Sequence, residues 1–104
     1  MTTVVYKINP KDSEEFEWDS NKATSNLQKH GITFQTAAEV FLDPFAVVTS
    51  DVRYSEERSQ ILGYSCLNRL LLVVFVERGT RNRIISARPA TRAELKLYES
   101  DRAN

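Results

Sequence analysis

The period of hydrophobic and polar positions changes near residue 46, and this change divides the predicted elements into two sets. Ahead of residue 46, apolar residues recur with a helical period on both sides of Gly31. Beyond it they alternate or run together, as they do in strands. Short strands are expected at residues 3–8 and 16–18, and further strands at residues 46–50, 58–65, 69–78 and 82–88.

The first predicted helix has clear signals at both ends. Asp19 is a good N-cap, the helix runs to about His30, and Gly31 supplies a C-terminal stop. Two stripes follow the helical spacing, one with Ala23, Leu27 and His30 and a neighbouring one with Lys22, Asn26 and Lys29. We expect the apolar stripe to pack on the rest of the protein.

Two more helices are predicted from their caps. Thr33 can cap a helix through Leu42, which ends before Pro44 because the residue before a proline avoids helical geometry. Thr91 and Glu94 have the spacing of a capping box and open a last helix.

Two turn signals connect the predicted strands after residue 46. They are Leu67-Asn68 and Gly79-Thr80, and they join the strands as hairpins. The chain therefore predicts one α+β domain over residues 1–104. It has an antiparallel sheet of about four strands, two N-terminal helices and a C-terminal helix.

The 104 residues include 14 basic and 14 acidic side chains, so the formal net charge is zero. Hydrophobic residues make up 41% and charged residues 27%, which is typical of a globular chain rather than a disordered one. The longest apolar run, residues 70–76, is too short to span a membrane. No secretory signal is visible at the start of the sequence. We therefore expect a cytoplasmic protein without membrane contact. Cys66 is alone, which excludes an internal disulfide.

The zero net charge hides an uneven distribution. Residues 1–52 sum to −4 and residues 53–104 to +4, and all nine arginines lie in the second half. Strict alternation in the last strand places Arg83, Ile85 and Ala87 on one face and Ile84, Ser86 and Arg88 on the other. Such an arginine cluster can hold a phosphodiester and stabilise a five-coordinate phosphorus, or it can be a solvated strand edge that prevents edge pairing.

His30 is the only histidine, and histidine is the side chain best suited to proton transfer near neutral pH. At a helix C-terminus it can equally be a half-buried structural residue that favours the helix dipole. One histidine, one cysteine and no ligand spacing among the carboxylates predict no metal site and no cofactor. Four rings can either stack on bases or belong to the core and its rim: Trp18, Tyr54, Tyr64 and Tyr98.

Several short motifs occur together in this chain. They are FEWD at residues 16–19, KHG at 29–31, VFLDP at 40–44, GYS at 63–65 and RIISAR at 83–88. In this combination the sequence resembles the BrnT toxin family of bacterial type II toxin–antitoxin systems over residues 16–99. It departs from the family in three ways: residues 1–14 are an extension, Asn68 stands where a glycine is common, and the chain is neutral where such toxins are usually basic.

The resemblance implies a compact RelE-like ribonuclease fold and metal-independent cleavage of RNA that arrests translation and growth. It also implies neutralisation by a BrnA-type antitoxin with a ribbon-helix-helix region, and binding of operator DNA only through the toxin–antitoxin complex. Carried onto matching positions, it implies a catalytic set of His30, Glu77, Arg78 and Arg88. The RNA-binding positions that it implies are Lys29, Arg58, Arg83, Ser86 and Arg92.

Two functional hypotheses remain at this point. In the first, the chain is an endoribonuclease in which His30 or Glu77 takes the 2′-hydroxyl proton, arginines hold the phosphate and a 2′,3′-cyclic phosphate forms. In the second, the arginines serve an acidic partner, and the chain is a non-catalytic binding module that acts as antitoxin partner and transcriptional corepressor. A third possibility, an unrelated enzyme for a carboxylate substrate, has only the arginine cluster in its favour.

Overall fold

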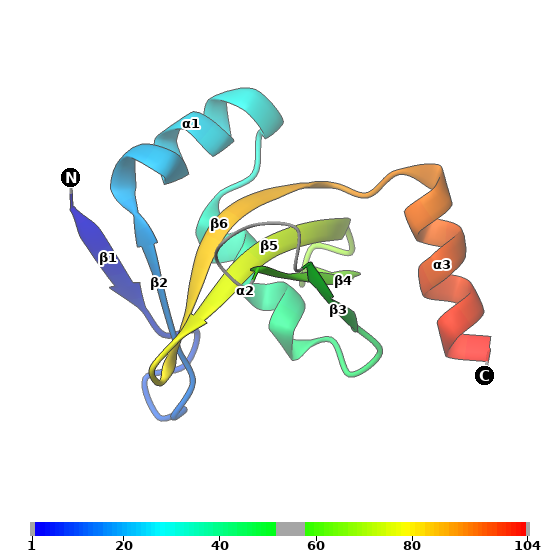
Figure 1. Cartoon of the computed structure of the whole chain (residues 1–104), viewed down its shortest axis with the longest axis horizontal. Coiled ribbons are helices and arrows are strands. Elements are labelled where there is room, and N and C mark those ends of the chain that lie inside the picture. Colours follow the sequence, from blue (N-terminus) through cyan, green and yellow to red (C-terminus); the bar gives the residue numbers. More distant parts are fainter. Residues whose placement is uncertain (1, 52–57, 104) are drawn as a thin grey trace.

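The structure is a computed structural model that describes residues 2–51 and 58–103. Figure 1 shows the arrangement of its helices and strands. In chain order the elements are β1 (Thr3–Tyr6), β2 (Glu15–Asp19), α1 (Ser20–His30), α2 (Phe34–Glu39), the 3-10 turn η1 (Val40–Leu42), β3 (Val47–Asp51), β4 (Arg58–Tyr64), β5 (Leu70–Arg78), β6 (Arg81–Pro89) and α3 (Arg92–Ala103). The predicted elements are present to within two residues of their expected bounds, and the second helix is α2 continued by η1.

The six strands form one sheet in the order β1-β2-β6-β5-β4-β3. Strands β3 to β6 are the predicted antiparallel meander, and the α+β class is confirmed. The sheet is larger than four strands because β2 pairs with β6 and β1 pairs with β2. The β2–β6 pair is parallel, so the sheet is mixed. Alternation within β2 predicts a strand but carries no information about its partner, which lies more than 60 residues away.

Local signals set the helix ends where they were predicted. Asp19 accepts two backbone N–H groups of the first turn of α1, at 2.7 and 3.3 Å, and Gly31 ends α1 with a φ of +70°. The Thr33 hydroxyl accepts an N–H of the first turn of α2 at 3.1 Å. The Thr91 N–H donates to the Glu94 carboxylate (2.8 Å) and the Glu94 N–H donates to the Thr91 hydroxyl (3.2 Å), which is a complete capping box.

The two faces of the sheet are covered by different helices. The main core lies on the face covered by α2 and consists of Phe16, Trp18, Ile32, Phe34, Ala37, Ala38, Val40, Ile61, Leu71, Val73, Phe75, Ile84 and Ala87. The opposite face carries Leu72, Val74 and Val76 of β5 and is named the outer face below. Tyr98 of α3 packs there against Leu62 and Leu72, at one end of the sheet (Figure 1).

A β-bulge in β6 corrects the predicted sorting of the last strand. Val74 pairs with Ser86 and Phe75 pairs with Ile84, so Ile85 is an extra residue and the alternation shifts by one. Consequently Ile84 and Ala87 both enter the core, although strict alternation had placed them on opposite faces. Arg83 moves to the outer face, where it joins Ser86 and Arg88.

The predicted apolar stripe of α1 is buried only in part. Ala23 packs against the main core and His30 is half-buried, but Leu27 is 47% exposed, and Asn26 is the buried residue of the helix. The reason is the neighbour of α1: β6 pairs with β2 only through residues 81–83, and beyond them α1 meets the polar backbone edge of β6. An amide satisfies such an edge and a leucine does not. None of the helices in the described part of the chain is long and apolar enough to cross a membrane.

Candidate functional site

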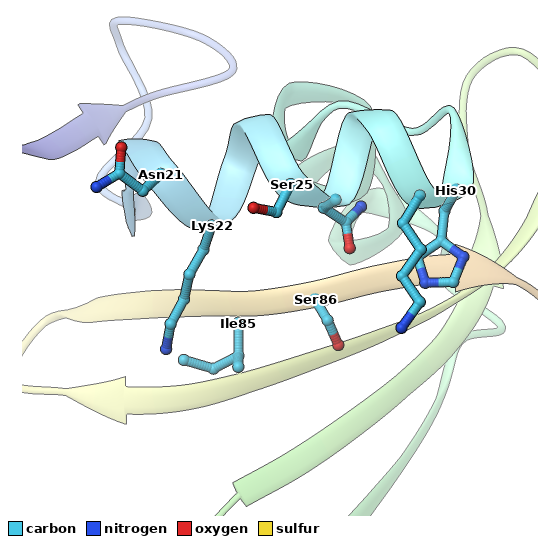
Figure 2. A pocket seen from close by; sticks show the side chains of 8 residues that line it. Asn21, Lys22, Ser25, His30, Ile85 and Ser86 are labelled. Atoms are coloured by element: carbon cyan, nitrogen blue, oxygen red, sulfur yellow. The ribbon is translucent and has the colours of Figure 1, made fainter.

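An open pocket of about 380 Å³ lies between α1 and the edge of β6. It is lined by Asn21, Lys22, Ser25, Asn26, Lys29, His30, Ile85 and Ser86. Figure 2 shows the Lys22 and His30 side chains extending from α1 toward β6. It also shows the Ser86 side chain on β6, near His30. The fold therefore brings three residues of the predicted site together, Lys29, His30 and Ser86, although they come from distant parts of the sequence.

Asn26 fixes α1 against β6 at this pocket. Its side-chain NH₂ donates to the carbonyl oxygens of Ala87 (2.9 Å) and Ile32 (3.1 Å), and its Oδ1 accepts the Ala87 N–H at 3.1 Å. The amide thus acts as a further strand residue paired with β6. Because Ala87 directly follows Ser86, and Lys29 and His30 lie three and four residues after Asn26, these bonds set the distance between the two walls of the pocket.

The pocket is electropositive. It contains two lysines and a histidine, and no acidic side chain lines it. Lys22 and Lys29 are exposed, and neither has an ion-pair partner among the described residues. His30 is half-buried in the last turn of α1. An anion such as a phosphodiester is the ligand that matches this charge.

Arg88 lies two residues beyond Ser86 on the outer face, and its guanidinium is held by Glu94 of α3. Nη1 donates to Oε1 at 2.8 Å and Nη2 donates to Oε2 at 2.9 Å, a two-pronged pair. The hydrogen bonds from Arg88, together with those from Thr91, lower the pKa of Glu94 against the opposing effect of burial. The same bonds and the charge of Glu94 raise the pKa of Arg88, so this arginine is positively charged and fixed in orientation.

Two other arginines of β6 are engaged by carboxylates of β2. Arg83 forms a short ion pair with Glu17, and both side chains are largely buried. Arg81 contacts Glu15 at 3.4 Å and Glu17 at 3.7 Å. These pairs follow from the parallel pairing of β2 with β6, so part of the acidic first half of the chain neutralises part of the arginine-rich second half.

The remaining predicted residues lie away from the pocket. Glu77 and Arg78 are exposed at the tip of the β5–β6 hairpin, and Glu77 is on the face opposite Ser86. Arg78 is on the outer face, but four residues along β5 from the partner of Ser86, which is about 13 Å. Arg58 is the first residue of β4, and Arg92 lines a second pocket beside α3. One phosphodiester group cannot contact all the predicted residues at once.

The sequence prediction did not include Lys22, which lines the pocket, or Glu94, which holds Arg88. The sequence places Lys22 on the same helical stripe as Asn26 and Lys29. What distinguishes it from an ordinary surface lysine is that no acidic side chain lines the pocket that it faces. Glu94 was predicted as a helix cap. Its hydrogen bonds with Arg88 could not be predicted, because they depend on where the fold places Arg88. Among the described residues there is no group of three potential metal ligands.

Comparison with known proteins identifies the family of the chain. Residues 18–94 match the family model described as ribonuclease toxin, BrnT, of type II toxin-antitoxin system. The chain therefore belongs to the BrnT family of ribonuclease toxins, and membership implies an RNA substrate and a cognate antitoxin. Residues 1–14, which include β1, lie outside the matched range.

A solved structure supports the same conclusion. The chain is similar to the 1.1 Å crystal structure of the Brucella abortus ribonuclease toxin BrnT, with 26% sequence identity and a TM-score of 0.57. The similarity covers 72% of this chain and 94% of that chain. The comparison with curated proteins gave no match.

Proposed function

We propose that the chain is a metal-independent endoribonuclease whose cleavage centre is the pocket between α1 and β6. The observation that carries this proposal is the pocket itself, which joins His30, Lys29 and Ser86 in a space lined by no acidic side chain. A histidine supplies proton transfer near neutral pH, and two lysines supply positive charge for a phosphate. Removal of a proton and stabilisation of the phosphate charge are two of the functions that RNA cleavage without a metal ion uses.

The proposed reaction is an attack of the ribose 2′-oxygen on the adjacent phosphorus. His30 accepts the 2′-hydroxyl proton, the bond from phosphorus to the 5′-oxygen breaks, and a proton from solvent completes the leaving 5′-hydroxyl. The products are a 2′,3′-cyclic phosphate and a free 5′-hydroxyl end. Lys29 and the Ser86 hydroxyl stabilise the additional negative charge on the five-coordinate phosphorus.

The arginines act along the RNA rather than all at the cleaved bond. Arg88 is the nearest of them to Ser86 on the outer face, and its orientation by Glu94 suits it to a neighbouring phosphate. Lys22 lies seven residues from Lys29 on α1, about 10 Å away, and contacts a different phosphate from that held by Lys29. We propose RNA contacts outside the cleavage centre for Arg58, Arg78, Arg83 and Arg92, and no part in the proton transfer for Glu77.

We propose two partners besides RNA: a cognate antitoxin, and operator DNA bound through it. The cognate antitoxin is of the BrnA type with a ribbon-helix-helix region, and operator DNA is bound only by the complex. Cleavage of RNA in the cytoplasm then arrests translation and growth until the antitoxin neutralises the toxin.

An experiment on the substrate tests the proposed chemistry. Purified protein in EDTA is incubated with an oligoribonucleotide and with the same oligonucleotide carrying a single 2′-deoxy sugar at the cleavage position. We expect cleavage of the first to cyclic phosphate and 5′-hydroxyl ends, and no cleavage of the second at that position. Lys29→Gln should slow cleavage at least about tenfold, whereas Lys96→Gln, on the exposed surface of α3, should not. Cleavage at the deoxy position would reject the attack by the 2′-oxygen.

A non-catalytic function is the second candidate, and one observation favours it. Arg83, predicted to bind RNA, and Arg88, predicted to be catalytic, are each held by a carboxylate of the same chain. In that case the chain binds the antitoxin as a corepressor and does not cleave RNA. Expression of the gene without an antitoxin distinguishes the two: growth arrest that Lys29→Gln relieves supports the ribonuclease, and normal growth supports the binding module.

A further inference from the structure

A second pocket, of about 430 Å³, lies beyond the C-terminal end of β6, between the β4–β5 turn and the first turn of α3. Its lining includes Tyr64, Asn68, Leu70, Thr91, Arg92 and Leu95. Tyr64 pairs with Leu70 on neighbouring strands, and Leu70 lies on the outer face. The pocket therefore opens on the same side of the sheet as Ser86 and Arg88, and its volume is within the range of small-ligand sites.

The aromatic wall of this pocket is held rigidly. The Tyr64 ring meets the Tyr98 ring edge-on, with centroids 5.2 Å apart and planes at 85°. Asp43 ties both residues down, because its Oδ2 accepts the Tyr64 N–H at 2.9 Å and the Tyr98 hydroxyl at 2.7 Å. A half-buried ring fixed in this way is a preformed surface on which a planar group can stack.

The polar groups of the pocket suit a nucleotide. Asn68 is in the left-handed conformation, with a φ of +62°, at the β4–β5 turn, and its amide can both donate and accept hydrogen bonds. Arg92 is exposed and, in contrast to Arg81, Arg83 and Arg88, has no ion-pair partner among the described residues. An aromatic ring, an amide and an uncompensated arginine are the groups that proteins use for a base and its phosphate.

We infer that this pocket binds one nucleotide of the RNA substrate, with its base against Tyr64 and Asn68 and its phosphate at Arg92. Ser86 and Ala90 are four residues apart along the chain, about 13 Å, and Arg88 lies between them on the same face. RNA that leaves the cleavage centre along β6 passes Arg88 before it reaches the pocket. The assignment of this nucleotide as a neighbour of the cleaved bond rests on the proposed function, whereas nucleotide binding itself does not.

Titration of the ¹⁵N-labelled full chain with each of the four nucleoside 5′-monophosphates tests the inference by NMR. At least one nucleotide should shift the backbone amides of Asn68, Leu70 and Thr91 in a saturable way. Ribose 5-phosphate, which lacks the base, should bind at least about fivefold more weakly, since base–aromatic stacking contributes that much or more. Equal binding of ribose 5-phosphate would reduce the site to a phosphate site and overturn the inference, as would the absence of saturable shifts.

Nucleotide binding by variants that preserve the fold tests whether the nucleotide occupies this pocket. Arg92→Gln changes an exposed side chain, and Asn68→Gly removes the amide while keeping a residue that accepts a positive φ. Each should weaken binding at least about fivefold. The matched control is Arg69→Gln, an exposed arginine in the same turn that does not line the pocket, and binding to it should equal that of the wild type. A loss in the control as large as that in Arg92→Gln would overturn the inference.

The titration needs no turnover, so failure of this inference and failure of the proposed function give different results. If RNA is cleaved but the nucleotides do not bind at these amides, the pocket is not a nucleotide site and the ribonuclease proposal stands. If the nucleotides bind and the binding depends on Arg92, but RNA is not cleaved, the binding site stands and the catalytic proposal is rejected.

Discussion

Asn26→Ala should destabilise the protein strongly, because it removes the hydrogen bonds that join α1 to β6. Asn26 is 7% exposed and makes three hydrogen bonds with buried backbone groups, two to Ala87 and one to Ile32. Alanine leaves all three groups without their partner. At about 1 kcal/mol for each lost bond, the expected loss is about 3 kcal/mol in the free energy of unfolding. This is a large part of the 5–15 kcal/mol that is typical of a domain.

Urea unfolding followed by circular dichroism measures this loss. The midpoint should fall by about 1–3 M at an unchanged slope. Leu27→Ala is the control, because Leu27 is the next residue and is 47% exposed, and its replacement should cost less than about 1 kcal/mol. If Asn26→Ala and Leu27→Ala lose the same stability, the pairing of α1 with β6 through Asn26 does not hold the helix in place.

Three further changes test other contacts. Because bonds with Arg88 lower the pKa of Glu94, the stabilisation by its carboxylate is present above the ordinary pKa of about 4.3 and is lost as the pH falls through the lowered folded value. Glu94→Gln should therefore lower the urea midpoint at pH 7, and the difference from wild type should shrink as the pH falls below the ordinary carboxyl pKa and vanish below the lowered folded pKa. Gly63→Ala places a Cβ 3.0 Å from a buried valine methyl and should cost about 1–3 kcal/mol by thermal unfolding. Tyr98→Phe removes the 2.7 Å bond to Asp43 and should cost about 1–3 kcal/mol by urea unfolding; an unchanged midpoint would contradict the role of this bond.

Elements whose signals are local were predictable from the sequence. Asp19, Gly31 and the Thr91–Glu94 pair act on backbone groups within four residues, so their identity and spacing suffice to locate helix ends. The turns at Leu67-Asn68 and Gly79-Thr80 were likewise predictable, because asparagine and glycine tolerate the positive φ that Asn68 and Gly79 adopt.

Features that depend on distant pairing were not predictable. The parallel β2–β6 pair brings Glu17 to Arg83, and nothing in either segment specifies the other. The bulge at Ile85 reverses the facing of Arg83, because one extra residue shifts the alternation on one side of it. Asn26 is buried because α1 meets an open strand edge, an environment that the helical period does not reveal.

The candidate site shows the same division. The motif around Lys29 and His30 led to the prediction of site residues on α1, and the motif around Ser86 and Arg88 led to the prediction of site residues on β6. Their meeting in one pocket, and the separation of Glu77 and Arg78 from it, follow from the sheet topology alone.

Cleavage of RNA in EDTA by the wild type and by His30→Ala tests the central claim most directly. Gln28→Ala, an exposed residue of the same helix that does not line the pocket, is the matched control. The wild type and the control should cleave RNA at equal rates, and His30→Ala should be slower by about 100-fold or more, as expected for the loss of a general base. Cleavage by His30→Ala at the wild-type rate would contradict the placement of the cleavage centre between α1 and β6.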